Sequence, residues 1–190
     1  TREKSERISR AAFRYAVAHG RRKVTCVHKA NIMKLSDGLF RSVFYEVAKE
    51  FPAIEADDKM VDAACMMLVM HPEIFDIMVM PNLYGDIVSD LTSGLIGGLG
   101  LLPSSNIGER MAMFEAVHGS APDIAGKNIA NPTAFLWSAC MMLEHLGDNE
   151  TAARIRRAVD ATLKEATSLT PDLGGTATTH EYTKAIVEKL

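Results

Sequence analysis

Apolar residues recur along this chain at two different spacings. Between residues 5 and 18 they return every three to four positions until Gly20, which predicts an amphipathic helix. Residues 23–28 instead alternate and carry β-branched side chains, as strands do. A second helix is expected from a Ser36 cap to about residue 50. Its apolar residues fall on one face: Phe40, Val43, Phe44 and Val47.

The next stretch predicts two more helices around a strand. One helix is expected to begin at Asp57 or Asp58 and to end near residues 71–72. The run 76–80 is wholly apolar behind its aspartate, which is typical of a buried parallel strand. A helix over residues 84–95 follows.

A glycine-rich stretch divides the chain. Residues 94–108 hold five glycines and one proline and are not expected to be regular throughout. The elements predicted beyond it are a strand at 111–115, a polar turn segment at 118–131, helices at 132–146 and 150–167, and a last helix capped at Thr178 by a capping box with Glu181. Helices that alternate with short apolar strands indicate an α/β fold, in two parts that meet at this stretch.

Composition narrows the class of protein. The 190 residues are 47% apolar and 24% charged with a net charge of -3, which describes a globular chain with a real core. No basic cluster suits nucleic acid, and no apolar run is long enough to span a membrane. Three separated cysteines indicate reduced thiols of an intracellular protein. The chain opens at Thr1 without a signal peptide, so we expect it to lie within a longer protein.

Two aspartates suggest a metal site. Asp86 and Asp90 are four residues apart, so on a helix their carboxylates project from one face. An all-oxygen pair suits Mg²⁺ or Mn²⁺ rather than zinc. The alternative is an exposed acidic helix face, although the flanking residues are mostly apolar.

A lysine and a third acid extend this hypothesis. Lys29 directly follows a predicted strand, and open α/β sheets bind ligands at the carboxyl ends of their strands. Beside a metal it could shuttle protons, whereas alone it would pass for a surface lysine. Asp62 is expected to face the apolar stripe of its helix, either as a satisfied buried acid or as a third metal ligand.

The segment 114–132 is a candidate nucleotide loop. Gly119, Pro122 and Gly126 shape a tight backbone whose N–H groups could meet a nucleotide. Asp123 could accept both ribose hydroxyls and would repel a 2′-phosphate, which favours NAD over NADP. The GxGxxG fingerprint is absent, and an ordinary loop remains the alternative.

Taken in order, these segments resemble a known family. The strings VHKANIMKLSDGLF, PNLYGDIVSDL, SNIG and FEAVHGSAPDIAGK are similar to those of the metal-dependent β-decarboxylating dehydrogenases of isocitrate, homoisocitrate and 3-isopropylmalate. They look most like the NAD-dependent isocitrate enzymes. Isopropylmalate enzymes usually carry Asp where His28 stands. Homoisocitrate enzymes share the His-Lys pair, SNIG and TPDLGG, but usually have Pro in place of Ala116.

The resemblance implies a fold and a set of site residues. The fold would be the two-domain isopropylmalate dehydrogenase-like α/β fold, with residues 1–96 as the small, dimer-forming domain and 97–190 as the C-terminal part of the large, nucleotide-binding domain. Catalysis would fall to Lys29 and Asn31. Asp86 and Asp90 would bind Mg²⁺ or Mn²⁺, while Asp62, with Lys29, would reach into the partner's site across a dimer interface. The adenosine pocket would be lined by His118, Gly119, Ala121, Asp123, Ile124 and Asn131, with NAD as cofactor.

The function implied is NAD-dependent oxidative decarboxylation of isocitrate to 2-oxoglutarate and CO₂. The alternatives are a homoisocitrate or 3-isopropylmalate dehydrogenase, a non-catalytic regulatory subunit of a hetero-oligomer, or a purely structural α/β domain. The partners expected are a 3-substituted malate and a second copy of the chain, without nucleic acid or membrane. The family's substrate arginines and catalytic tyrosine would precede Thr1, so the isolated chain is expected to be inactive. Its compartment would be the bacterial cytoplasm or the mitochondrial matrix.

Overall fold

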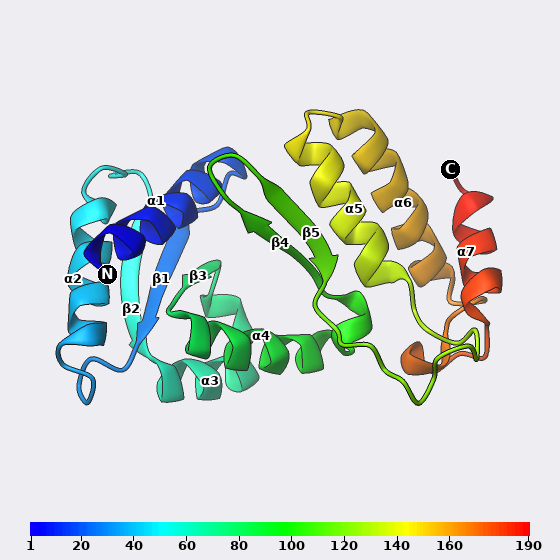
Figure 1. Ribbon diagram of the computed structural model, residues 1–190, viewed down its shortest axis with the longest axis horizontal. Helices are drawn as coiled ribbons and strands as arrows, with labels where there is room; N and C mark the ends of the chain where they lie inside the picture. The colour runs from blue at the N-terminus through cyan, green and yellow to red at the C-terminus, as the bar shows by residue number, and fades with distance from the viewer. The chain divides into compact units, whose positions relative to one another are not determined.

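The structure is a computed structural model that describes all 190 residues. It divides into two compact units, residues 1–92 and 93–190. The first unit alternates helices and strands along the chain (Figure 1). Its elements are α1 (Arg2–Ala18), β1 (Lys23–His28), α2 (Ser36–Ala48), β2 (Glu55–Met60), α3 (Val61–Met70), a 3₁₀ turn (Pro72–Ile74), β3 (Ile77–Val79) and α4 (Asn82–Ile96), whose last residues belong to the second unit.

A parallel three-stranded sheet forms the centre of the first unit. Its order is β2-β1-β3, so β1 lies in the middle and is buried from Val24 to His28. The register places His28 opposite Met60 of β2 and Cys26 opposite Val79 of β3. The predicted strand at 23–28 and the predicted parallel strand after Asp76 are both confirmed.

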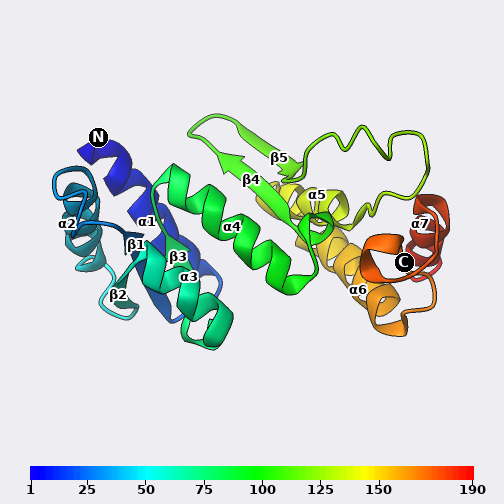
Figure 2. The ribbon, with the colours of Figure 1, turned by 90° about the horizontal axis from the view of Figure 1, so that it is seen from below.

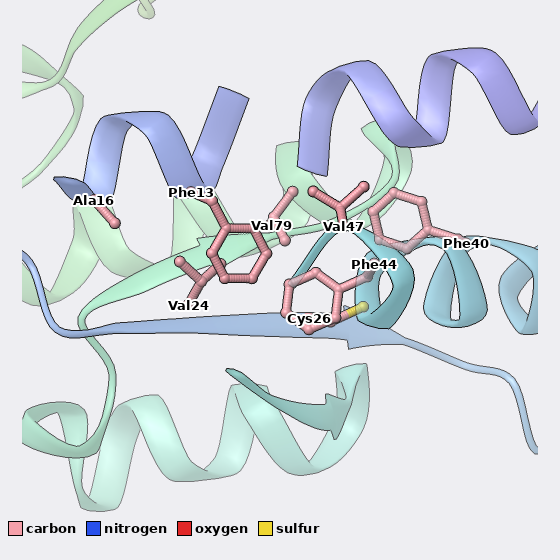
Figure 3. Close-up of a cluster of buried hydrophobic side chains, with 8 residues drawn as sticks. All are labelled: Phe13, Ala16, Val24, Cys26, Phe40, Phe44, Val47 and Val79. Carbon is pink, nitrogen blue, oxygen red and sulfur yellow. The ribbon is translucent and has the colours of Figure 1, made fainter. Parts of the chain in front are cut away.

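One face of this sheet carries the core of the unit. Figure 3 shows the side chains from α1, α2 and β3 gathered on one side of β1. The rings of Phe13 and Phe44 stack at 5.3 Å between centroids, which joins α1 to α2. Burial of such apolar surface is the main stabilising contribution to a fold of this kind. The predicted apolar face of α2 is confirmed, since Phe40, Val43, Phe44 and Val47 are all buried.

Two expectations about this unit are wrong. Asp57 and Asp58 do not begin a helix but lie in β2, and the helix starts only at Val61. β2 is an edge strand with four charged residues, and it is defined by pairing with β1 rather than by any apolar alternation of its own. Ser36 is not a cap: Leu35 occupies that position, and the Ser36 hydroxyl donates to the Asp37 carboxylate at 3.1 Å.

The second unit pairs a hairpin with three helices. Its elements are a 3₁₀ turn (Leu99–Leu101), β4 (Pro103–Ile107), β5 (Ala112–Ala116), α5 (Thr133–His145), α6 (Asn149–Glu165), a 3₁₀ turn (Pro171–Leu173) and α7 (Thr179–Val187). β4 and β5 are antiparallel. The sequence did not predict β4, because it lies within the glycine-rich stretch. The capping box of Thr178 and Glu181 at the start of α7 is confirmed.

The long segment between β5 and α5 contains no helix or strand and runs toward the start of α7 (Figure 2). Two hydrogen bonds hold it there: the Thr179 N–H donates to the Asn128 carbonyl at 2.9 Å, and the Thr179 hydroxyl donates to the Ala130 carbonyl at 2.6 Å. The polar turn segment predicted at 118–131 is therefore confirmed as irregular backbone, and its last residues are joined to α7.

The helices and the three cysteines can be compared with what the sequence predicted for them. None of the helices combines the length and the apolar character needed to cross a membrane. All three cysteines are free thiols, with Cys26 and Cys140 buried and Cys65 half-buried. Burial raises the pKa of Cys26 to about 12, so this thiol is unreactive at neutral pH.

Candidate active site

The strands of the first unit end together at one edge of the sheet. Because β1 and β2 are parallel and His28 is paired with Met60, the residues that follow them emerge side by side. Lys29 comes directly after β1, and Asp62 is the second residue of α3, directly after β2. β3 leads at the same edge into α4, which carries Asp86 and Asp90. This is the edge that binds ligands in open α/β sheets, and Lys29 and Asp62 lie there, while Asp86 and Asp90 lie further along the helix that begins after β3.

Lys29 and Asp62 form an ion pair at this edge. The Lys29 Nζ lies 2.6 Å from Oδ1 of Asp62, and this hydrogen bond lowers the pKa of the Asp62 carboxyl. Asp62 does not face the apolar stripe of α3 as expected, since its side chain is 64% exposed. The helix begins only at Val61, so Asp62 lies in its first turn, where a carboxylate also complements the helix dipole.

The buried carboxylate of Asp37, which the sequence analysis did not single out, accepts a hydrogen bond from the backbone of Lys29. Oδ2 of Asp37 accepts the Lys29 N–H at 2.8 Å and the Tyr84 hydroxyl at 2.8 Å, while Oδ1 accepts the Ser36 hydroxyl at 3.1 Å. Burial raises the pKa of Tyr84, and the bond to Asp37 raises it further. Asp37 thereby connects the end of β1 to α4. The only sequence signal for it is an acid in the first turn of a helix.

A second polar network lies behind the lysine. The Asp58 carboxylate accepts hydrogen bonds from His28 at 2.8 Å, from Arg41 at 3.0 Å and from the Tyr45 hydroxyl. Burial alone would raise the pKa of Asp58, but these three donors together hold it well below its usual range.

The tautomer of His28 follows from its two partners. Because a carboxylate can only accept, the His28 proton sits on Nε2, and Nδ1 accepts the Ala30 N–H at 3.0 Å. The network therefore also holds the backbone one residue after Lys29. Asn31, the other predicted catalytic residue, is exposed on the turn that follows.

The acidic pair fits a hard divalent cation. Asp86 and Asp90 are both exposed on α4, one turn apart, and neither carboxylate forms an ion pair within the chain. Two uncompensated oxygen donors on one helix face are the donor set that Mg²⁺ or Mn²⁺ prefers. No group of three or more His, Cys, Asp or Glu side chains comes together to hold a metal. Asp62 is therefore not gathered with the pair within one chain.

The second unit contains a cavity of about 930 Å³. Its walls are mostly small and apolar residues of the segment between β5 and α5, closed by the 3₁₀ turns and the start of α7. Five of the six residues predicted for an adenosine pocket line it, and Asp123 lies beside them as an exposed neighbour of Ile124. The five lining residues are His118, Gly119, Ala121, Ile124 and Asn131.

Residues that sequence reasoning missed complete the cavity. The Asn131 side chain donates to Oδ2 of Asp172 at 2.9 Å and accepts the Thr133 N–H at 3.0 Å. A Cβ on Gly100 would lie 2.9 Å from that Asp172 oxygen, so only glycine leaves the wall in place. Apolar walls with a few fixed polar groups suit the adenosine part of a dinucleotide such as NAD.

A lysine paired with an aspartate at the carboxyl edge of a parallel sheet, two neighbouring exposed acids on the helix after β3, and a largely apolar cavity in the second unit suit a metal-assisted, nucleotide-dependent dehydrogenase. The chain belongs to the isocitrate/isopropylmalate dehydrogenase family, whose profile matches residues 1–187.

Relatives with different names match the whole chain. It is 57% identical to 3-isopropylmalate dehydrogenase of Archaeoglobus fulgidus, of which it covers 58%. It is 56% identical to a catalytic chain of the mitochondrial NAD isocitrate dehydrogenase of Arabidopsis thaliana and covers 51% of it. It is 58% identical to a regulatory chain of the mitochondrial NAD isocitrate dehydrogenase of Dictyostelium discoideum and covers 54% of it. The chain thus spans about half the length of these relatives.

A solved structure shares the fold. The crystal structure of isocitrate dehydrogenase from Methylococcus capsulatus matches all of this chain with a TM-score of 0.97 and 55% identity, and 56% of that protein is covered. The predicted fold class is confirmed by this likeness.

Proposed function

We propose that this chain is part of an enzyme that oxidises isocitrate with NAD and decarboxylates the product, giving 2-oxoglutarate and CO₂, with the help of Mg²⁺ or Mn²⁺. The observation that carries the proposal is the Lys29–Asp62 ion pair after β1 and β2, together with the exposed acids Asp86 and Asp90 one turn apart on the helix after β3. The string around His28 supports isocitrate as the substrate over 3-isopropylmalate, while the names of the relatives include both substrates.

Each group at this edge has a chemical task in such a reaction. Asp86 and Asp90 would hold the divalent cation, which supplies Lewis-acid polarisation of the substrate oxygens when bound. The Lys29 Nζ, in its neutral amine form, would accept the hydroxyl proton of the substrate as the carbon that bears the hydroxyl gives its hydride to NAD. Asp62 keeps Nζ in place through its 2.6 Å hydrogen bond. Asn31, on the exposed turn two residues later, would contact the substrate.

The active site would be shared between two copies of the chain. No third metal ligand joins Asp86 and Asp90 within one chain, and Asp62 is exposed on a different helix. We therefore propose that Lys29 and Asp62 of one protomer complete the site of the other in a dimer. The apolar side chains exposed on α4, Leu83 and Ile87, are suited to burial in such an interface.

The cavity of the second unit would bind the adenosine part of NAD. An imidazole ring (His118) and an apolar side chain (Ile124) line it, and Asn131 is fixed by two hydrogen bonds. Asp123 is exposed next to the cavity, where its carboxylate would accept ribose hydroxyls and repel a 2′-phosphate. A second carboxylate, Asp172, also lines the cavity and adds negative charge to it.

A regulatory role in a hetero-oligomer is the second candidate, favoured by the 58% identity to a protein named as regulatory. The presence of Lys29, Asp62, Asp86 and Asp90 supports a catalytic role, since a chain without turnover has no need of all four.

A substrate panel on the whole enzyme tests the proposal. NADH formation would be followed with isocitrate, homoisocitrate and 3-isopropylmalate, each with NAD and Mn²⁺. We expect the highest kcat/KM with isocitrate. A higher value with another substrate would reassign the specificity, and no turnover with any of the three would contradict a catalytic role. The 190-residue chain alone is expected to show no turnover.

A further inference from the structure

Asp37 is a charged side chain placed where charge is costly. Asp37 is only 6% exposed, yet its carboxylate forms no ion pair with a cationic side chain. Its charge is instead satisfied by three hydrogen-bond donors and by its position in the first turn of α2, where the helix dipole favours an anion. A buried carboxylate with good hydrogen bonds fixes its donors firmly, because releasing any of them would leave a buried acceptor unsatisfied.

Two of the three donors on Asp37 come from parts of the chain that would serve different sites of the dimer, Lys29 the partner's site and α4 its own. One is the backbone N–H of Lys29, 2.8 Å from Oδ2, and the other is the Tyr84 hydroxyl, also 2.8 Å from Oδ2. Tyr84 lies two residues before Asp86 on α4. A single carboxylate oxygen therefore joins the residue that carries the ammonium to the helix that carries the acidic pair.

No other side chain makes this connection among the hydrogen bonds of the first unit. The Lys29 ammonium is held from α3 by Asp62, and the Ala30 N–H is held by His28, but neither of these contacts reaches α4.

We propose that Asp37 is a positioning residue of the reaction: it fixes the backbone of Lys29, which would act in the partner's site, and it fixes α4, whose acidic pair would hold the metal of its own site. This inference rests on the function proposed above. Asp37 itself would touch neither substrate nor cofactor. Its effect would be carried to the lysine through one hydrogen bond and to the metal helix through the other.

Three substitutions separate the two hydrogen bonds. Asp37→Ala removes both, Tyr84→Phe removes only the bond to α4, and Asp37→Asn keeps an oxygen acceptor of nearly the same shape. When a catalytic group is displaced by even a small distance from the reacting atoms, the reaction rate falls steeply. We expect Asp37→Ala to lower kcat of the whole enzyme at least about tenfold and to raise the KM for Mn²⁺. Asp37→Asn should restore kcat to within about threefold of the original enzyme.

Tyr84→Phe gives the decisive separation. We expect it to raise the KM for Mn²⁺ about three- to tenfold while kcat at saturating Mn²⁺ stays within about twofold, since the lysine side of the network is intact. Tyr15→Phe is the matched control, because Tyr15 is an exposed tyrosine on α1 stacked on His19. It should change neither constant.

The outcomes distinguish this inference from the proposed function. If the original enzyme shows no Mn²⁺-dependent turnover, the proposed function itself is wrong. If it turns over but Tyr84→Phe leaves the KM for Mn²⁺ unchanged, Asp37 does not position α4. If a folded Asp37→Ala protein keeps its original kcat, Asp37 does not position Lys29; should that variant fail to fold, a kcat for Asp37→Asn more than about tenfold below the original would overturn the proposal.

Discussion

The Lys29 ammonium lies 2.6 Å from the Asp62 carboxylate, although 33 residues separate them in the chain. The parallel register of β1 and β2 brings them together, since each follows the end of its strand. Neither is deeply buried: the Lys29 side chain is 26% exposed and that of Asp62 is 64% exposed. An exposed ion pair of this kind contributes little to stability, so its value to the protein lies in holding the ammonium in place.

Replacing the lysine should be visible in the titration of its partner. The hydrogen bond from Lys29 lowers the pKa of Asp62, so Lys29→Met is expected to raise that pKa toward the ordinary value of about 3.9. The measurement is the pH titration of the Asp62 carboxyl carbon by NMR in the whole protein. Lys34 is an exposed lysine in the turn that follows Lys29. Lys34→Met is therefore the control, and it should leave the pKa of Asp62 unchanged. If the pKa of Asp62 is the same in Lys29→Met as in the original protein, the ion pair does not form in solution.

The network around Asp58 should contribute to stability. Asp58→Ala removes the acceptor shared by His28, Arg41 and Tyr45 and leaves the N–H of the buried His28 ring without a partner. Such a loss in a partly buried network costs about 2–4 kcal/mol. Chemical denaturation at pH 7 measures it, with Asp160→Ala on the exposed face of α6 as a control that should change the free energy of unfolding by less than about 0.5 kcal/mol.

The same network predicts a pH dependence. The pKa of Asp58 is lower in the folded protein than in the unfolded chain, so its contribution is fully present above the unfolded value of about 3.9. It is lost as the pH falls below that value and through the folded pKa. The difference in unfolding free energy between the original protein and Asp58→Ala should therefore shrink as the pH falls from 5 toward 3. A difference that stays constant over this range would contradict the assigned protonation of Asp58.

The cofactor preference should depend on two neighbouring residues. Asp123→Lys combined with Ile124→Tyr replaces the carboxylate beside the cavity by a cation, which would attract rather than repel a 2′-phosphate. We expect the ratio of kcat/KM for NADP to that for NAD to rise at least about tenfold in the whole enzyme, which is the effect of about 1.4 kcal/mol. Asp160→Lys, on the exposed face of α6, is a charge-matched control. An unchanged ratio would mean that this loop does not contact the ribose.

Local signals predicted much of this fold. The strand at 23–28, the buried face of α2 and the capping box of α7 each depend on residues close together in sequence, and all three are present. β2 could not be predicted in the same way. Its four charged residues form a strand only because β1 offers backbone partners along its length, which is a tertiary effect.

The site residues also divide into those that local sequence signals predict and those that depend on tertiary contacts. Lys29, Asp86 and Asp90 could be singled out because residue type and spacing carry their chemistry. Asp37 and Asp172 could not, because their partners Tyr84 and Asn131 are 47 and 41 residues away and the contacts exist only in the folded chain. The exposure of Asp62 was missed because it depends on where α3 begins, and that boundary is set by the pairing of β2.

Binding of Mn²⁺ to the whole enzyme, measured by isothermal titration calorimetry in the absence of NAD, tests the central claim most directly. The account predicts saturable binding that is weakened at least about tenfold by Asp86→Asn or Asp90→Asn. Circular dichroism should show that both variants keep their fold, because both carboxylates are exposed. Mn²⁺ binding of unchanged affinity in these two variants would contradict the assignment of the cation to the α4 acids, and with it the proposed chemistry of this edge of the sheet.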